Sequence, residues 1–264
     1  MQMALNLLAR ATGNRFAQKG LEFTVRACQY LMGIGAGSRV AESGEASAFR
    51  VLKNRFKPPY CIFDVGANKG QFLQMTLANI PVQDLTIHCF EPGHATFTEL
   101  MAVSGSIPNI KCNNFALGNE QGESILHYDV AGSGLASLSK RRLDHFQISF
   151  EESEVIEIDT IDNYCQRNQI HHINLLKIDI EGHELDALAG AQGMFEKKQI
   201  DLVTFEFGGG NIDTKTYFQD FWYFFSGLGM KIFRITPSGY LYRIDSYKEI
   251  DEQFRTMNYL VFFE

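Results

Sequence analysis

The feature that most constrains this chain is a short stretch in which an apolar run turns into a helical pattern, residues 61–70 (CIFDVGANKG). The run reaches Asp64, and Gly66 and Gly70 follow before the helical pattern begins. Glycine has no Cβ atom, so it permits tight backbone angles and lets a ligand lie close to the main chain. The following helix presents unpaired N–H groups and the positive end of its dipole. The stretch therefore predicts a parallel strand, a tight turn and a helix, with a cofactor site at the turn.

From residue 60 onward, strand-like and helix-like segments alternate. The strand-like runs are 61–65, 85–91, 110–115, 175–180, 202–207, 231–235 and 258–263. The helix-length segments include 70–79, 94–103, 183–196 and 214–227. This alternation is typical of an α/β fold with a mostly parallel sheet and helices on both faces. No helical pattern lies between residues 235 and 259, so the last strand must pair antiparallel.

Three regions follow from the same patterns. Residues 1–56 form an N-terminal helical extension or cap, in which apolar residues recur at helical spacing. Residues 57–264 form the α/β domain. Within it, residues 119–160 differ in character and contain a Gly-Ser-Gly turn followed by a Val-Ile-Glu-Ile run. We interpret this segment as an inserted hairpin or edge pair beside the ligand crevice.

The charge of the chain is unevenly distributed. The net charge is −7, but residues 1–60 carry nine Lys or Arg against three Asp or Glu, which leaves −13 for the remainder. An acidic body argues against a nucleic-acid partner, because phosphate binding depends on Lys and Arg. We interpret the basic front as the solvated face of helices that cap the domain. Contact with an anionic membrane surface or an acidic partner is the alternative.

The remaining bulk properties point to an ordinary protein of the cytoplasm. No apolar stretch is long enough to cross a bilayer, and the first twenty residues lack the pattern of a signal peptide. The five cysteines are far apart, which indicates free thiols in a reducing compartment. The histidines show no zinc spacing. Nothing in the pattern specifies an oligomeric state.

Four predicted strands end in an acid: Asp64, Glu91, Asp179 and Glu206. In an open parallel sheet, ligands bind outside the carboxyl ends of the strands, near the point where the strand order reverses. If these strands are parallel, the four carboxylates lie along one edge of the sheet. We therefore expect a ligand site at that edge.

The position of Glu91, 25 residues past Gly66, suits a carboxylate that accepts hydrogen bonds from an adenosine ribose. NAD and S-adenosylmethionine both fit this geometry. Three features favour S-adenosylmethionine. The turn lacks the G-x-G-x-x-G pattern, the last strand is antiparallel, and Asp64 would repel a diphosphate but suit a cationic ammonium or sulfonium group.

Several motifs occur together in this chain: DVGANKG at 64–70, FEP at 90–92, ALG at 116–118, IDTID at 158–162 and KIDIEGHE at 177–184. The run SGLASL at 133–138 is a looser match. Together these motifs resemble the FkbM-type methyltransferases over residues 44–206. The first forty residues match no pattern of that family.

This resemblance implies a class I methyltransferase fold, which is a Rossmann-like sheet of seven strands. It also implies S-adenosylmethionine as the methyl donor and O-methylation of a hydroxyl on a small molecule or glycan, such as a sugar or secondary metabolite. Carried over by motif, the following residues would contact the donor: Asp64, Gly66, Asn68 and Gly70 around its methionine half, Glu91 at the ribose, and Asn114 and Ala116 beside the adenine. Pro92, which follows Glu91 in its motif, is also assigned to the donor site. Glu45 would reach the donor's amino group.

An alcohol is a poor nucleophile at neutral pH, so it needs a base or a cation close to its oxygen. The candidate catalytic residues are Asp179, His183, Glu206 and Glu181. Asp179 is the first choice for contact with the acceptor oxygen. His183 is a candidate base, because histidine is the side chain whose ordinary pKa lies nearest neutrality. A divalent metal is possible on Asp179, Glu181 and Glu206, but the spacing does not demand one, and we assign no metal ligand.

Two other interpretations stay open at this point. One is an NAD-dependent Rossmann oxidoreductase, which the missing G-x-G-x-x-G pattern disfavours. The other is a non-catalytic scaffold with the same architecture, because a fold does not determine a function.

Overall fold

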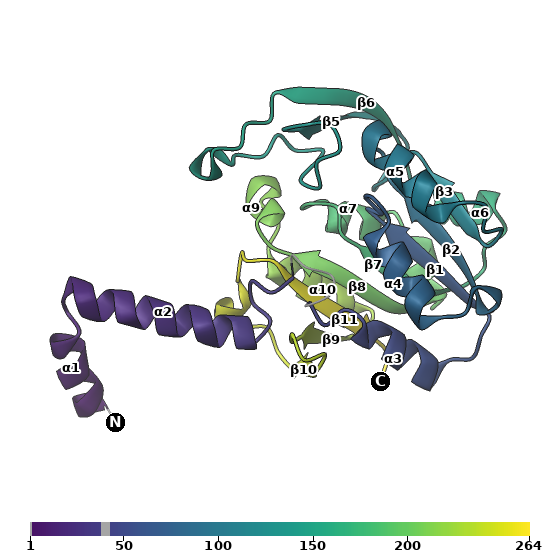
Figure 1. Ribbon diagram of the computed structural model, residues 1–264. Coiled ribbons are helices and arrows are strands. Elements are labelled where there is room, and N and C mark those ends of the chain that lie inside the picture. The colour runs from purple at the N-terminus through teal and green to yellow at the C-terminus, as the bar shows by residue number, and fades with distance from the viewer. Residues whose placement is uncertain (1, 38–42) are drawn as a thin grey trace.

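A large twisted sheet with helices on both faces forms the body of the protein in the computed structural model, which describes residues 2–37 and 43–264 (Figure 1). Within these residues the sheet contains the strands β1 (Tyr60–Val65), β2 (Leu85–Phe90), β3 (Ile110–Asn113), β7 (Ile173–Ile178), β8 (Ile200–Phe207), β9 (Lys231–Ile235), β10 (Leu241–Ile244) and β11 (Met257–Phe262). Their order is β10-β9-β11-β8-β7-β1-β2-β3. The strand order reverses between β1 and β7, which places a ligand crevice at their carboxyl ends.

The predicted strands and the predicted direction of the last strand are confirmed. β1, β2, β3, β7 and β8 pair in parallel, whereas β11 pairs antiparallel with both β8 and β9. The sheet differs from the expected seven strands by one short edge strand, β10, which pairs antiparallel with β9 after a tight turn at residues 236–240. This strand was missed because its four residues are mostly solvent-facing and carry no strong apolar pattern.

Helices cover both faces of the sheet, as predicted. One face carries α3 (Ser47–Arg55), α4 (Gln71–Asn79) and α5 (His94–Ser104), and the other carries α6 (Ile161–Arg167), α7 (Glu184–Ala189), α8 (Gln192–Glu196) and α10 (Phe218–Gly227). The expected helix over 183–196 is divided in two at residues 190 and 191, and a Cβ atom at Gly190 would lie 2.0 Å from the carbonyl oxygen of Gly118. A separate short helix, α9 (Gly210–Thr214), precedes α10.

The segment predicted as an inserted hairpin forms a second small sheet of β4 (Ala116–Leu117), β5 (Gly122–Tyr128) and β6 (Glu152–Asp159), in the order β4-β6-β5. β5 and β6 are antiparallel. Figure 1 shows this sheet lying over the ends of the main strands, so the long connection between β5 and β6 forms a roof above the crevice. Short 3-10 turns lie at η1 (Val82–Asp84), η2 (Asp144–Phe146) and η3 (Glu249–Asp251).

The N-terminal helices α1 (Gln2–Ala11) and α2 (Arg15–Leu31) extend away from the body instead of capping it (Figure 1). No residue of α2 is buried. Of the helices in residues 1–56, α3 packs on the sheet, whereas the apolar side of α2 packs on nothing within the described residues. None of the described helices combines the length and the apolar character that a membrane span requires.

The turn after β1 requires glycine at residue 66 for a reason internal to the fold. Gly66 has φ +76°, and a Cβ atom there would lie 1.9 Å from the carbonyl oxygen of Asp179. Gly66→Ala should therefore lower the free energy of unfolding by about 3 kcal/mol or more, because a strained backbone angle and a direct overlap add together. Denaturant titration measures this loss. Gly122→Ala is the matched control, since a Cβ there meets nothing within 4 Å, and an equal loss in both variants would contradict the argument.

Candidate active site

A cavity of about 650 Å³ lies between the carboxyl ends of the central strands and the roof segment. Its volume is in the range of small-molecule sites. The predicted site residues that line it are Glu45, Gly66, Asn68, Glu91, Pro92, Ala116, Asp179, Glu181, His183 and Glu206. Three others, Asp64, Gly70 and Asn114, lie behind its wall. The parallel strands thus bring residues from six separate stretches of the sequence to one place, as the strand-end argument requires.

The glycine turn shapes this cavity through its backbone. Gly70 begins α4 in the left-handed conformation and packs against Val103 of α5. Asn68 also has a positive φ, of 48°. Its backbone N–H donates to Glu91 across a distance of 2.9 Å. Its side-chain Oδ1 is buried and has no donor among the described residues, although the residue lines the cavity. Asn68 therefore offers an acceptor for a polar group of a ligand.

Glu91 is held by three hydrogen bonds at the end of β2. Its carboxylate accepts from the backbone N–H groups of Asn68 and Gly93, and from the Thr96 hydroxyl at 2.6 Å. Burial raises the pKa of Glu91, and these hydrogen bonds oppose the shift. A carboxylate has about four acceptor positions, so one is left for a ligand hydroxyl. Asn114 fixes this strand end from behind, because its side chain donates to the carbonyls of Glu91 and Pro92.

The structure corrects the role expected of Asp64. Its carboxylate is fully buried, and Oδ1 lies 3.1 Å from the Nζ atom of Lys177 on the neighbouring strand. Lys177 also donates to the carbonyl of Gly66 at 2.8 Å. Burial opposes the charge of Lys177, but Asp64 and then Asp179 raise its pKa above the ordinary value. Asp64 therefore neutralises an internal lysine and supports the turn, and it does not select a cationic ligand by contact.

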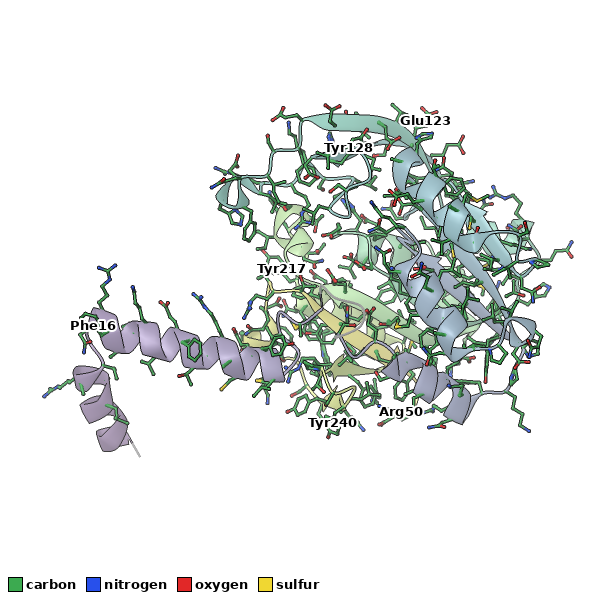
Figure 2. The ribbon with its side chains drawn as sticks, viewed as in Figure 1. Phe16, Arg50, Glu123, Tyr128, Tyr217 and Tyr240 are labelled. Carbon is green, nitrogen blue, oxygen red and sulfur yellow. The ribbon has the colours of Figure 1, made fainter. Side chains whose placement is uncertain are left out.

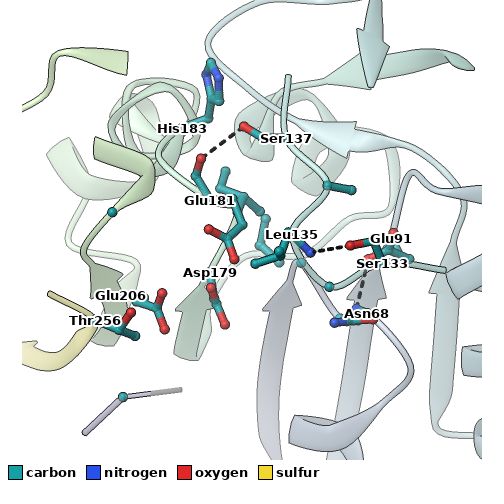
Figure 3. Close-up of a pocket in the computed structure, with 18 of the residues that line it drawn as sticks. Asn68, Glu91, Ser133, Leu135, Ser137, Asp179, Glu181, His183, Glu206 and Thr256 are labelled. Atoms are coloured by element: carbon teal, nitrogen blue, oxygen red, sulfur yellow. Dashed lines mark hydrogen bonds between the residues drawn. The ribbon is translucent and has the colours of Figure 1, made fainter. Parts of the chain in front are cut away.

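The negative charge of the cavity comes instead from Asp179, Glu181, Glu206 and Glu45. Figure 3 shows the side chains of Asp179, Glu181 and Glu206 extending into the same space. Burial, then the charge of Asp179, raise the pKa of Glu45 to about 7. Burial, opposed by Arg141, raises the pKa of Glu181 to about 8. Burial, followed by Asp179 and Glu181, raises the pKa of Glu206 well above its ordinary value. These shifts show that the acids compete for protons, and a cation in the cavity would relieve their repulsion.

Arg141 is a functional candidate that the sequence did not reveal. This buried residue of the roof pairs with Glu181, and its Nε atom lies 3.4 Å from Asp213 of α9. The Ser137 hydroxyl donates to the carbonyl of Glu181 at 3.0 Å, as marked in Figure 3. The neighbouring run at 133–138 was noted as a motif, but no local pattern distinguishes Arg141 from other arginines. The roof is therefore tied to the acid group by an ion pair and a hydrogen bond.

His183 occupies a different part of the site from the acids. Figure 3 shows its ring directed away from Asp179 and Glu206. Both ring nitrogens have partners: Nδ1 lies 2.8 Å from Asp186, and Nε2 lies 3.0 Å from the Ser139 hydroxyl. The structure therefore does not bring this candidate base together with the acids, and we assign His183 to holding the roof against α7.

Within residues 2–37 and 43–264, no three His, Cys, Asp or Glu side chains are arranged to hold a metal ion together. The acids named as possible hard ligands have other neighbours: Glu181 pairs with Arg141, and Asp179 lies 3.7 Å from Lys177.

Comparisons with known proteins identify the family of this chain. The chain is 23% identical over 197 residues to the 2-O-methyltransferase NoeI of Sinorhizobium fredii, covering 70% of this chain and 79% of that protein. It is 25% identical over 167 residues to the hexuronic acid methyltransferase AglP of Haloferax volcanii, covering 62% of this chain and 64% of that protein. The crystal structure of methyltransferase FkbM from Methylobacillus flagellatus aligns with a TM-score of 0.46 at 17% identity, covering 78% of this chain and 44% of that chain. The family model described as the methyltransferase FkbM domain matches residues 64–258, so the chain belongs to the FkbM methyltransferase family.

Proposed function

We propose that this methyltransferase uses S-adenosylmethionine to methylate a hydroxyl group of a sugar, either free or within a glycan. The observation that carries the proposal is the group of acids at the carboxyl ends of β2, β7 and β8, beside a cavity of sufficient size. The names of the relatives support the acceptor class, because one is a 2-O-methyltransferase and the other acts on hexuronic acid.

The residues present fit this donor. S-adenosylmethionine supplies a methyl group on a positively charged sulfur, and it also carries an ammonium group. Glu45, Asp179 and Glu206 favour such a cation, whereas they would repel the diphosphate of NAD. Asn68 and Glu91 each offer an acceptor for hydroxyl or amino groups. We assign Glu91 to the ribose and Glu45 to the ammonium group.

Asp179 is the residue that we place against the acceptor. It ends the central strand β7, lines the cavity, and its side chain is 39% exposed, so it is reachable by an incoming hydroxyl. As the acceptor oxygen gains the methyl group, its proton passes to the carboxylate of Asp179. Glu206 and Glu181 lie nearby in the same cavity, and burial raises the pKa of each. Proton transfer to a positioned base contributes about 100- to 10,000-fold to rates of this kind.

Titration calorimetry followed by a transfer assay tests this function. We expect binding of S-adenosylmethionine and of its demethylated product, and no binding of NAD. Radiolabelled methyl groups should then pass to a uronic acid or neutral sugar in a panel of free sugars and oligosaccharides. Binding of NAD alone would support an oxidoreductase. Binding of the methyl donor without transfer to any hydroxyl acceptor would support a non-catalytic scaffold.

Donor binding should weaken as the pH falls. A cationic donor is held by ionised Glu45, and the pKa of Glu45 in the free protein is about 7. Below that pH the carboxyl must release a proton before it can hold the cation, so affinity should drop about tenfold between about pH 8 and about pH 6. Calorimetry across this range measures the change. Glu45→Gln should bind more weakly at the higher pH and show a flatter profile, and an affinity that rises on acidification would contradict the assignment.

A further inference from the structure

Helix α2 presents a large apolar surface to solvent. Phe16, Phe23 and Leu31 are 88%, 74% and 74% exposed, and Leu21 and Val25 are also exposed. Figure 2 shows Phe16 at the end of α2 that is far from the body. Soluble proteins rarely leave a contiguous apolar surface of this kind uncovered, so a helix face without a partner marks an interaction site.

The side chains of α2 are sorted by type around the helix. Phe16, Phe23 and Tyr30 are seven residues apart, so they form one aromatic stripe along the helix. A basic stripe of Arg15, Lys19 and Arg26 lies next to it, and Glu22 is the one acid in this helix. Aromatic and aliphatic residues on one side with Lys and Arg on the other are typical of helices that lie in the interface of an anionic membrane.

The charge of the body favours a lipid surface over a second copy of the chain. The helix is basic, so the same helix of a second copy would repel it. The chain beyond residue 60 carries −13 and would be held away from anionic lipid, whereas the basic stripe would be attracted. The sorted charges therefore orient the protein with α2 toward the membrane and the acidic body toward water.

The C-terminal end of α2 forms hydrogen bonds to a segment that lines the cavity. The Gln29 side chain donates to Gln253 and accepts from Arg255, each at 2.9 Å. Beyond the helix, the backbone N–H groups of Gly35 and Gly37 donate to the carbonyl of Thr256. Residues 254–256 line the cavity, as do both glycines. We propose that α2 binds the surface of an anionic lipid membrane and thereby holds the methyl-transfer cavity next to that surface.

Flotation of the full-length protein with vesicles tests this inference. One set of vesicles contains phosphatidylcholine alone, and the other contains phosphatidylcholine with phosphatidylglycerol. The protein should associate at least about tenfold more with the anionic vesicles, and added salt should weaken the association. Two double variants, Phe16→Glu with Phe23→Glu and Lys19→Glu with Arg26→Glu, should each lose about tenfold or more of this association.

Ile250→Glu is the matched control, because Ile250 is 74% exposed like Phe23 but lies on η3. It should float with anionic vesicles as well as the wild type does. Light scattering without lipid tests the alternative partner of α2, which is a second copy of the chain, because it detects a dimer. The proposal would be overturned if the wild type failed to associate with anionic vesicles, or if the control lost association to the same extent. A dimer that forms without lipid, and that the Phe16→Glu and Phe23→Glu changes separate into monomers, would also overturn it. Circular dichroism and donor calorimetry establish that every variant is folded.

Discussion

Lys177→Met should unfold at a much lower denaturant concentration than the wild type, with a loss of about 3–5 kcal/mol in the free energy of unfolding. The substitution leaves the fully buried carboxylate of Asp64 without its cation, and it removes the hydrogen bond to the carbonyl of Gly66. The folded-state pKa of Lys177 is raised, so the contribution of the pair is fully present below the ordinary lysine pKa and is lost only in strong alkali. The loss should therefore be complete at neutral pH, where urea titration measures it.

The double variant Asp64→Asn with Lys177→Met provides the decisive control. It removes both charges, so it should recover a large part of the stability that the single variant loses. Arg243→Met is a second control, because Arg243 lies in an exposed ion pair with Asp245 and should cost less than about 1 kcal/mol. Strictly additive losses in the double variant would show that Asp64 and Lys177 do not depend on each other.

Asp179→Asn should lower kcat by about 100- to 10,000-fold while the affinity for the methyl donor changes only a few-fold. The amide keeps the size of the side chain but cannot accept the proton of the acceptor hydroxyl. Glu45 and Glu206 stay in place to hold a cation. Single-turnover transfer to the acceptor found in the sugar panel measures the chemical step, and calorimetry measures donor binding independently.

Asp186→Asn is the matched control for this prediction. Asp186 is an acid of the same length, but it contacts Nδ1 of His183 instead of the acid group. It should retain turnover within a few-fold, and so should His183→Ala. If Asp179→Asn turned over normally while His183→Ala lost activity, the histidine would be the base. A collapse of donor binding in Asp179→Asn would instead make Asp179 a donor ligand.

The expectation for Asp64 shows where local reasoning reaches its limit. The sequence shows an acid near the end of an apolar strand, and three of the four such acids do line the cavity: Glu91, Asp179 and Glu206. Asp64, in contrast, is fully buried inside the protein. There it meets Lys177, 113 residues away in the chain. Negative charge in the cavity still favours a cationic donor, but that charge belongs to the carboxylates that line the cavity and not to Asp64.

The glycines of the turn provide a second example. Their spacing correctly indicated a tight strand-to-helix turn, and both have the positive φ that such a turn requires. At Gly66, however, the atom that excludes a side chain is the carbonyl oxygen of Asp179, and a Cβ at Gly70 would lie 3.1 Å from Val103. A single sequence cannot distinguish a glycine required by a ligand from one required by a neighbouring strand.

The sequence by itself determined the class of fold and the edge of the sheet that carries the site, because apolar periodicity and strand-end acids are local properties of the chain. Only the tertiary structure decided which groups face the cavity. The pairing of Asp64 with Lys177, the ion pair of Arg141 in the roof with Glu181, and the contact of Ser139 in the roof with His183 depend on strand register and loop placement. These are set by packing between segments far apart in sequence, and no local pattern encodes them.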